Sequence, residues 1–144
     1  MYTSALVAAL HFLTIGLGFA GVWIRGRGLR AGDVPTTLYG DNVWGVAAVF
    51  WLGTGLARAF GGLEKGTAWY LNSPLFWVKM GLFALVMLLE LWPMITFIRW
   101  RVRLGRGEAV DTSVMPVLAR INTVEIALTA AIPFVAVAMA RGLV

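Results

Sequence analysis

The stretch PLFWVKMGLFALVMLLELWPMITFI, residues 74–98, decides the fold, because it is nearly free of charge and long enough to cross a bilayer. A helix rises about 1.5 Å per residue, so the hydrocarbon core of a membrane requires about 20 apolar residues. Three more runs of this kind occupy residues 4–24, 43–60 and 114–140. Backbone groups in hydrocarbon need hydrogen-bond partners within their own segment, which favours helices. The sequence therefore predicts one all-α domain over residues 1–144, a polytopic membrane protein built as a bundle of four transmembrane helices.

The composition agrees with a lipid environment. Of 144 residues, 60% are hydrophobic and 13% are charged, with a mean hydropathy of +0.81. Soluble domains are about half apolar and about a quarter charged, so a cytosolic enzyme is excluded. The absence of cysteine excludes disulfides, iron–sulfur clusters and covalently attached haem. The net charge of +5 predicts no nucleic-acid partner, because the arginines lie beside apolar runs, where membrane topology explains them.

The basic residues predict how the helices are oriented. Seven arginines follow the first and third apolar runs, whereas three basic residues lie on the other side. The positive-inside rule places the two arginine-rich connections in the cytoplasm and both termini on the outer side. We expect residues 25–32 to be part of the first of these loops. The seven arginines are Arg25, Arg27, Arg30, Arg99, Arg101, Arg103 and Arg106.

Five ionisable residues lie at membrane depth, where such groups are costly and are candidates for function. Helical rise places His11 and Lys79 at one shallow level near the outer boundary. It places Glu90 and Glu125 at a deeper level, nearer the cytoplasm. Lys79 and Glu90 are eleven residues apart, three turns of helix, so both face one direction. Arg120 lies near the cytoplasmic edge.

Each of these residues also has a purely structural interpretation. His11 could bond a neighbouring helix, and Lys79 could extend along the span to reach the outer boundary. Arg120 could extend to the cytoplasmic edge or pair with Glu90. Glu125 is expected to be either protonated or paired, which is typical of a carboxyl that handles protons. Polar residues on the same helix faces add Thr14 beside His11 and Asn122 beside Glu125.

Two further patterns have competing interpretations. Gly16, Gly18 and Gly21 match the dinucleotide pattern GxGxxG, but no strand precedes them, so close packing of helices is the better interpretation. Trp44, Trp51 and Arg58 are spaced by heptads, and this stripe could line a pocket, pack against a neighbouring helix or face lipid.

Several short segments resemble those of a known enzyme family. Ala9-Leu10-His11 followed by Phe19-Ala20-Gly21 resembles the first span of membrane-embedded protoporphyrinogen oxidases of the HemJ type, and Trp77-Val78-Lys79 resembles the start of their third. Arg120, Asn122 and Val124 resemble part of their last span. Residues 23–27 depart from that family, and the segments 72–79 and 139–142 are similar to an uncharacterised bacterial family of small four-span membrane proteins.

The resemblance to the oxidases implies a haem-linked redox protein that acts on a porphyrinogen-like substrate. His11 would be the metal-binding residue, an axial ligand of haem b, and Lys79 would lie near propionates or substrate carboxylates. With a single histidine, the second axial ligand would be absent, be supplied by Met80, or come from a homodimer. The expected catalytic residues are Lys79, Glu90 and Glu125. The expected cofactor-binding residues are His11, Thr14, Arg120 and Asn122.

Two other functions remain open at this point. The chain could be a non-catalytic accessory subunit of a larger membrane complex, or a binder of lipid or pigment. It could also be a proton-coupled carrier that uses Glu90 and Glu125, although four spans are few for a transporter. The expected location is the inner membrane of a bacterium.

Overall fold

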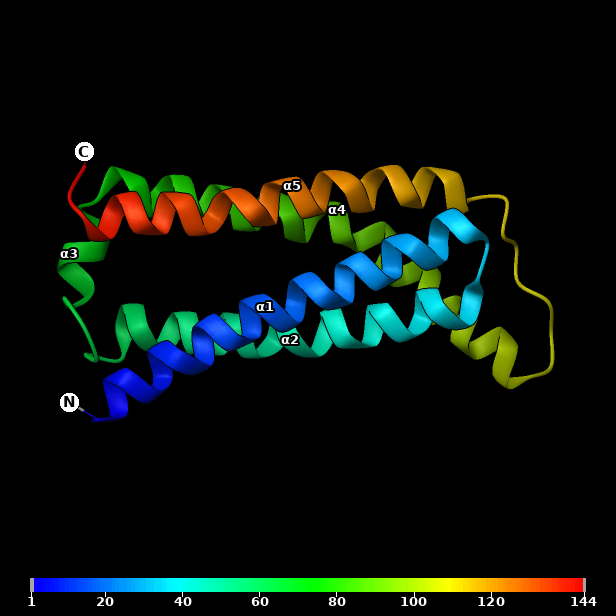
Figure 1. Ribbon diagram of the computed structural model, residues 1–144, viewed down its shortest axis with the longest axis horizontal. Coiled ribbons are helices and arrows are strands. Elements are labelled where there is room, and N and C mark those ends of the chain that lie inside the picture. Colours follow the sequence, from blue (N-terminus) through cyan, green and yellow to red (C-terminus); the bar gives the residue numbers. More distant parts are fainter. Residues whose placement is uncertain (1, 144) are drawn as a thin grey trace.

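A computed structural model describes residues 2–143, and no strand occurs among them. The helices are α1 (Tyr2–Ala31), α2 (Val34–Phe60), α3 (Thr67–Leu71), α4 (Pro74–Gly105) and α5 (Met115–Ala140). The four long helices are apolar and long enough to cross a membrane, which confirms the all-α fold and the four spans. Both ends of the chain and α3 lie at one end of the bundle, and the α1–α2 and α4–α5 connections lie at the other (Figure 1).

The helices extend beyond the predicted spans. Residues 25–31 continue α1, and α2 begins at Val34, so the predicted first loop shrinks to a tight turn. Gly32 provides this turn with a φ of 71°. Asp33 then caps α2 by accepting a hydrogen bond from the Thr36 backbone at 3.1 Å. The third predicted span likewise extends past residue 98 to Gly105, and α3 adds a turn that was not predicted.

Glycines of α1 allow α2 to approach closely. A Cβ atom at Gly21 would lie 2.5 Å from the backbone nitrogen of Trp44, and one at Gly18 would lie 3.3 Å from the Trp44 ring. Only a residue without a side chain permits this distance between helices. Close helix packing is thus the correct interpretation of the glycine pattern at Gly18 and Gly21, whereas Gly16 faces open space.

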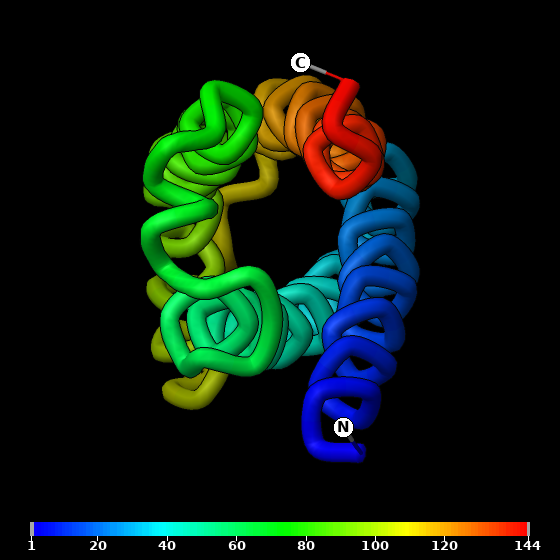
Figure 2. The backbone as a smooth tube through the Cα atoms, turned by 90° about the vertical axis from the view of Figure 1, so that its left-hand side faces the viewer, coloured from blue at the N-terminus to red at the C-terminus, as the bar shows by residue number. Residues whose placement is uncertain are grey.

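Viewed along its length, the bundle is a ring of helices in the order α1, α2, α4, α5 (Figure 2). Packing is extensive between α1 and α2, and slight between α2 and α4. Buried apolar residues form separate clusters along the bundle, including Leu29, Phe97 and Leu118 at one end and Tyr70 and Phe76 at the other. Large apolar side chains cover the outside, as lipid requires.

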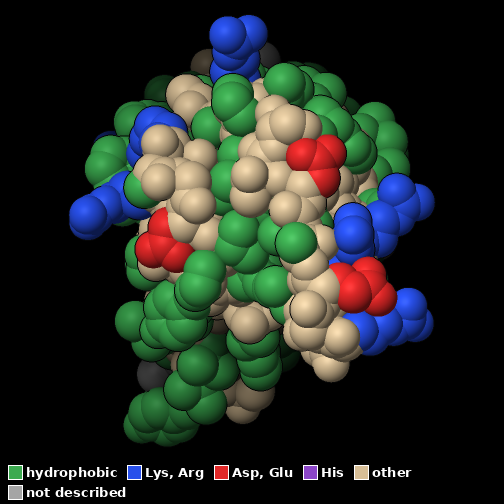
Figure 3. Space-filling view, turned by 90° about the vertical axis from the view of Figure 1, so that its right-hand side faces the viewer, with side chains coloured by type: hydrophobic (Ala, Val, Ile, Leu, Met, Phe, Trp, Pro, Cys, Tyr) green, Lys and Arg blue, Asp and Glu red, His purple; other side chains and the backbone are tan. Residues whose placement is uncertain are grey.

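Basic side chains form a fringe around the end of the bundle at which the α1–α2 turn lies (Figure 3). Arg27, Arg30, Arg103 and Arg106 are exposed in this region. This is the end that the positive-inside rule predicts to be cytoplasmic. Arg25 does not belong to this fringe, because its side chain is fully buried.

Candidate functional site

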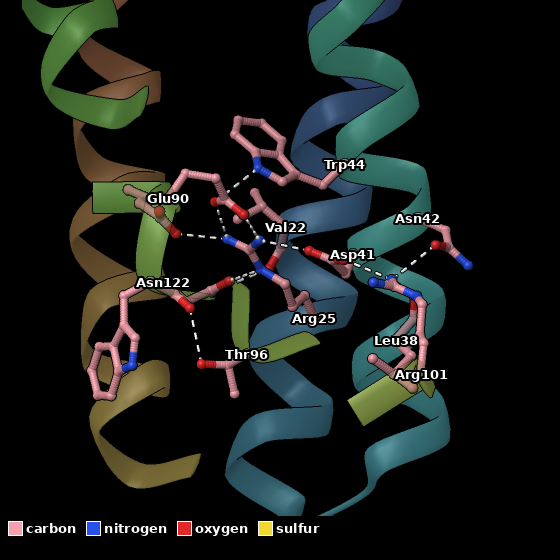
Figure 4. Close-up of polar contacts among 12 residues, drawn as sticks. Val22, Arg25, Leu38, Asp41, Asn42, Trp44, Glu90, Thr96, Arg101 and Asn122 are labelled. Carbon is pink, nitrogen blue, oxygen red and sulfur yellow. Dashed lines mark hydrogen bonds and ion pairs between the residues drawn. The ribbon is translucent and has the colours of Figure 1, made fainter. Parts of the chain in front are cut away.

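The most polar part of the interior surrounds Arg25. We call Arg25, Asp41, Glu90, Asn122 and Glu125 the Arg25 cluster; its members come from all four long helices. Figure 4 shows the guanidinium between Glu90, Asn122 and Asp41. Its Nε donates to Asn122 Oδ1 at 2.7 Å, and its Nη1 donates to Asp41 at 3.1 Å and to Glu90 Oε1 at 2.7 Å. Nη2 donates to Glu90 Oε2 at 3.0 Å and to Glu125 Oε2 at 2.6 Å. All five N–H donors of the guanidinium are therefore used.

The position of Arg25 corrects the expectation that it is a surface charge of a cytoplasmic loop. Side chains on a helix point back toward its N-terminus, so an arginine near the end of α1 extends toward the membrane interior. Close packing on α2 keeps this part of α1 helical and buried; a Cβ at Gly28 would lie 2.5 Å from the Thr37 backbone nitrogen. Glu90 therefore pairs with Arg25, and not with Arg120, which was one of the two alternatives for that residue.

Two residues of α2, Trp44 and Asp41, extend the hydrogen bonds of the cluster. Trp44 is buried, and its Nε1 donates to Glu90 Oε2 at 3.1 Å. Asp41 also accepts from Arg101 Nη2 at 2.7 Å, so one carboxylate bridges two arginines. The second arginine lies closer to the basic end of the bundle and is partly exposed.

A second polar site surrounds His11, nearer the chain termini. Trp51 Nε1 donates to His11 Nε2 at 3.2 Å, and His11 Nδ1 lies 2.8 Å from Thr54 Oγ1. Because an indole nitrogen can only donate, His11 Nε2 must accept and Nδ1 must carry the proton. The hydrogen bonds thus select one neutral tautomer of the imidazole and occupy both of its nitrogens.

A cavity of about 180 Å³ lies against this imidazole; we call it the His11 cavity. Trp51 and Lys79 form part of its wall. They also line an adjoining, mostly apolar pocket between α2 and α4, whose lining includes Met80 and Phe83. Phe83 packs edge-on against Trp51, with ring centroids 5.9 Å apart. The cavity therefore has a polar end near the chain termini and an apolar wall.

Charged groups from the end of α2, the segment between α2 and α4, and α4 itself line the polar part of the His11 cavity. Arg58 Nε donates to Glu64 Oε1 at 2.6 Å, and the Tyr70 hydroxyl donates to Glu64 Oε2 at 2.8 Å. Partial burial opposes ionisation of Glu64, but these two bonds outweigh it and lower its pKa. Burial, and then the bond to Glu64, raise the pKa of Tyr70 to about 12. Lys65 and Lys79 also line the cavity.

One known family matches nearly the whole chain. A family described as "Predicted membrane protein (DUF2214)" matches residues 3–144. The chain belongs to the DUF2214 family. No curated protein matches it significantly, and neither does any solved structure. The match and the four apolar helices together identify an integral membrane protein.

In this DUF2214 chain, the two predicted levels of polar residues do form two sites. His11 and Lys79 line one cavity, and Glu90, Asn122 and Glu125 meet in the Arg25 cluster. The heptad stripe of α2 lines these sites instead of facing lipid: Trp44 reaches Glu90, Trp51 reaches His11, and Arg58 lines the His11 cavity.

Two predicted site residues of the DUF2214 chain lie apart from both sites. The Thr14 hydroxyl donates to the His11 carbonyl at 2.8 Å, an ordinary bond within the helix. Arg120 is exposed beside Arg30 at the basic end of the bundle. Of the Arg25 cluster, the sequence prediction missed Arg25 and Asp41. The spacing of Gly21, Arg25 and Gly28, which places all three on one helix face, was the available signal.

The side chains described so far are poorly arranged to bind a metal ion. Among residues 2–143, no group of three or more histidine, cysteine or acidic side chains is arranged to hold one. An axial haem ligand needs a free imidazole nitrogen, but Trp51 occupies Nε2 and Thr54 occupies Nδ1. The cavity is also smaller than the roughly 300 Å³ of the smallest usual ligand pockets. His11 in this arrangement therefore does not fit a haem.

Proposed function

We propose that this protein binds the anionic head of an amphiphile in the His11 cavity, with the apolar part of that molecule directed toward lipid. The observation that supports this proposal is Lys79, a half-buried ammonium group in the cavity wall with no carboxylate partner among residues 2–143. A cation that is partly buried without a counterion is costly, and a ligand carboxylate or phosphate would supply one. Such a protein is a lipid or pigment binder.

The charge balance of the cavity supports an anionic ligand. Arg58, Lys65 and Lys79 contribute three positive charges to its wall, and Glu64 contributes one negative charge. Arg58 is already paired with Glu64, so the two lysines are left to attract an anion. The Lys79 ammonium lies 5.3 Å from the ring centroid of Phe76, a contact that helps to hold it in place without neutralising it.

The apolar wall supports an amphiphile over a small soluble anion. The pocket that adjoins the cavity is lined mostly by α2 and α4, which pack only slightly against each other. Leu52, Leu56 and Phe60 line it and are also 40%, 45% and 45% exposed on the outside of the bundle. A hydrocarbon chain could therefore pass from the cavity into the bilayer between these helices. The volume of the cavity suits a head group rather than an entire drug-sized ligand.

A second candidate function is the haem-linked oxidation of a porphyrinogen that the HemJ resemblance implies. One observation favours it: His11 and Lys79, which carry the resemblance, lie in one cavity although they belong to α1 and α4. The hydrogen bonds that occupy both nitrogens of His11 count against it. A homodimer, partner subunits and a bacterial inner-membrane location also remain predictions.

The test of the first proposal uses a fluorescent long-chain fatty acid and the uncharged amide of the same chain. We expect purified protein in detergent to bind the acid more tightly, and Lys79→Gln to weaken acid binding by about tenfold, or about 1.4 kcal/mol, without affecting the amide. Arg106→Gln, an exposed cation at the other end, is the matched control. Equal affinity for acid and amide, or no effect of Lys79→Gln, would refute the proposal.

The visible absorption spectrum separates the two candidates. The head-group proposal predicts no Soret band in protein expressed with haem available. A Soret band that disappears in His11→Ala would instead establish the haem-linked candidate.

A further inference from the structure

The Arg25 cluster contains three carboxyl groups, more than Arg25 and the adjoining Arg101 can neutralise. Asp41 lies between Arg25 and Arg101 and accepts from both, and the shorter bond, 2.7 Å, comes from Arg101. If Arg101 neutralises Asp41, then Arg25 alone faces Glu90 and Glu125. One guanidinium cannot balance two ionised carboxylates inside a membrane, where an uncompensated buried charge costs several kcal/mol.

The hydrogen bonds distinguish the two carboxyl groups. Glu90 accepts three donors, two from Arg25 and one from the Trp44 indole, as an ionised carboxylate does. Glu125 accepts one, from Arg25 Nη2 to its Oε2. Its side chain is 0% exposed, and its Oε1 is buried without a hydrogen-bond partner. Full ionisation would leave this buried oxygen charged and without a donor, so Glu125 is the carboxyl group that protonation favours.

We propose that Glu125 carries an exchangeable proton on Oε1, and that this proton enters and leaves by way of Thr129 from the direction of the His11 cavity. Loss of the proton leaves Glu125 as a second carboxylate against Arg25, which stays charged throughout. The cluster is then a proton-binding site within the membrane and lies outside the site proposed for an amphiphile.

Thr129 is the next buried polar side chain after Glu125 along α5. It lies one helical turn beyond Glu125, and its hydroxyl is also buried without a partner. Pro133 has no N–H, so the Thr129 carbonyl loses its helical donor and can accept another hydrogen bond. Ile132 and Pro133, the next turn of α5, line the His11 cavity.

The groups that face Glu125 come from every neighbouring long helix. Among residues 2–143, Arg25 is the only cation bonded to Glu125, and Arg101 acts through Asp41. The full set is Arg25 of α1, Asp41 of α2, Glu90 and Arg101 of α4, and Asn122 of α5.

Infrared spectroscopy of the full-length protein in lipid tests for the proton itself. At neutral pH we expect a C=O stretching band of a protonated carboxyl group, absent from Glu125→Gln and retained in Glu108→Gln, an exposed control. Glutamine mimics the neutral acid, so Glu125→Gln should fold as the wild type does, whereas Glu90→Gln should be less stable. No such band, a band that survives Glu125→Gln, or a protein that tolerates Glu90→Gln but not Glu125→Gln would overturn the proposal.

The route is tested by transferring the protein to D2O and following the isotope shift of that band. We expect Thr129→Val to slow the exchange by about tenfold, which corresponds to about 1.4 kcal/mol of added barrier. Thr123→Val, which alters an exposed threonine of the same helix, should leave the rate unchanged. An unchanged rate in Thr129→Val would also overturn the proposal.

Discussion

Arg25 and Glu90, 65 residues apart in the chain, form a two-pronged ion pair that ties α1 to α4 within the bundle. Nη1 lies 2.7 Å from Oε1, and Nη2 lies 3.0 Å from Oε2. The planar guanidinium matches the carboxylate geometrically, which a lysine ammonium cannot do. The same guanidinium reaches α2 and α5, so one side chain connects all four spans.

Replacing Arg25 should therefore destabilise the protein strongly. We expect Arg25→Ala to lower the free energy of unfolding by about 3–5 kcal/mol, because it leaves buried carboxylates without their counterion. Arg25→Lys should recover only part of this, since lysine has three donors in place of five. Arg27→Ala, two residues along and exposed, should change stability by less than about 0.5 kcal/mol. Denaturant unfolding in detergent measures all three variants, and similar losses for Arg25→Ala and Arg27→Ala would contradict the assignment.

Alanine at two glycines of α1 should have opposite effects. Gly21→Ala places a Cβ 2.5 Å from the Trp44 backbone, and we expect a loss of about 1–3 kcal/mol from overpacking. Gly16→Ala meets nothing within 4 Å and should gain about 0.5–1 kcal/mol from reduced chain entropy. Thermal unfolding of the pair checks the α1–α2 contact, and two changes of the same sign would show that the helices do not cross at Gly21.

The hydrogen bond between Tyr70 and Glu64 predicts a change in stability at high pH. The pKa of Tyr70 is about 12 in the folded protein, against about 10 for an unfolded chain. The folded state thus holds this proton more tightly, so stability falls as the pH rises from about 10 to about 12. Ultraviolet titration should show one late phenolate that is absent from Tyr70→Phe and present in Tyr39→Phe. Glu64→Gln should move the late titration to lower pH, and a titration that does not move would rule out the bond.

Glu64 should affect the stability of the protein at low pH. Its pKa is lowered in the folded protein, so the stability that it contributes is present above the unfolded pKa of about 4.3 and is lost as the pH falls through the folded value. Glu64→Gln should flatten this part of the stability curve measured by thermal unfolding. Glu108→Gln, at the other end of the bundle, is the control, and equal slopes for wild type and Glu64→Gln would contradict the prediction.

The orientation in the membrane can be tested directly because the chain has no cysteine of its own. Thr67→Cys and Ser113→Cys place single exposed thiols at opposite ends of the bundle. In intact bacterial cells expressing each variant, an impermeant maleimide should label Thr67→Cys alone, and after lysis it should label both. The reverse pattern would mean that the termini face the cytoplasm.

The sequence was sufficient for the four spans and for the grouping of polar residues. Helical rise placed His11 level with Lys79, and Glu90 level with Glu125, and both pairs do share a site. These expectations succeeded because depth in a membrane follows directly from position along a straight helix.

The burial of Arg25 could not be read in the same way. Hydropathy treats a glycine- and arginine-rich segment as a loop, whereas close contact with α2 keeps residues 25–31 helical. The pairing of Trp51 with His11 also depends on how α1 and α2 are rotated against each other, which neither helix specifies alone. Both errors concern contacts between helices, where side-chain packing overrides local composition.

The slight packing between α2 and α4, beside the apolar pocket, affects how binding must be measured. A molecule that enters the His11 cavity through this side of the bundle reaches it by lateral diffusion within a two-dimensional solvent, not from bulk water. Occupancy then follows the mole fraction of ligand in the bilayer, so diluting a sample with lipid empties the site even when the aqueous concentration is constant. A modest contact with Lys79 can be enough, because the membrane has already concentrated and aligned the ligand.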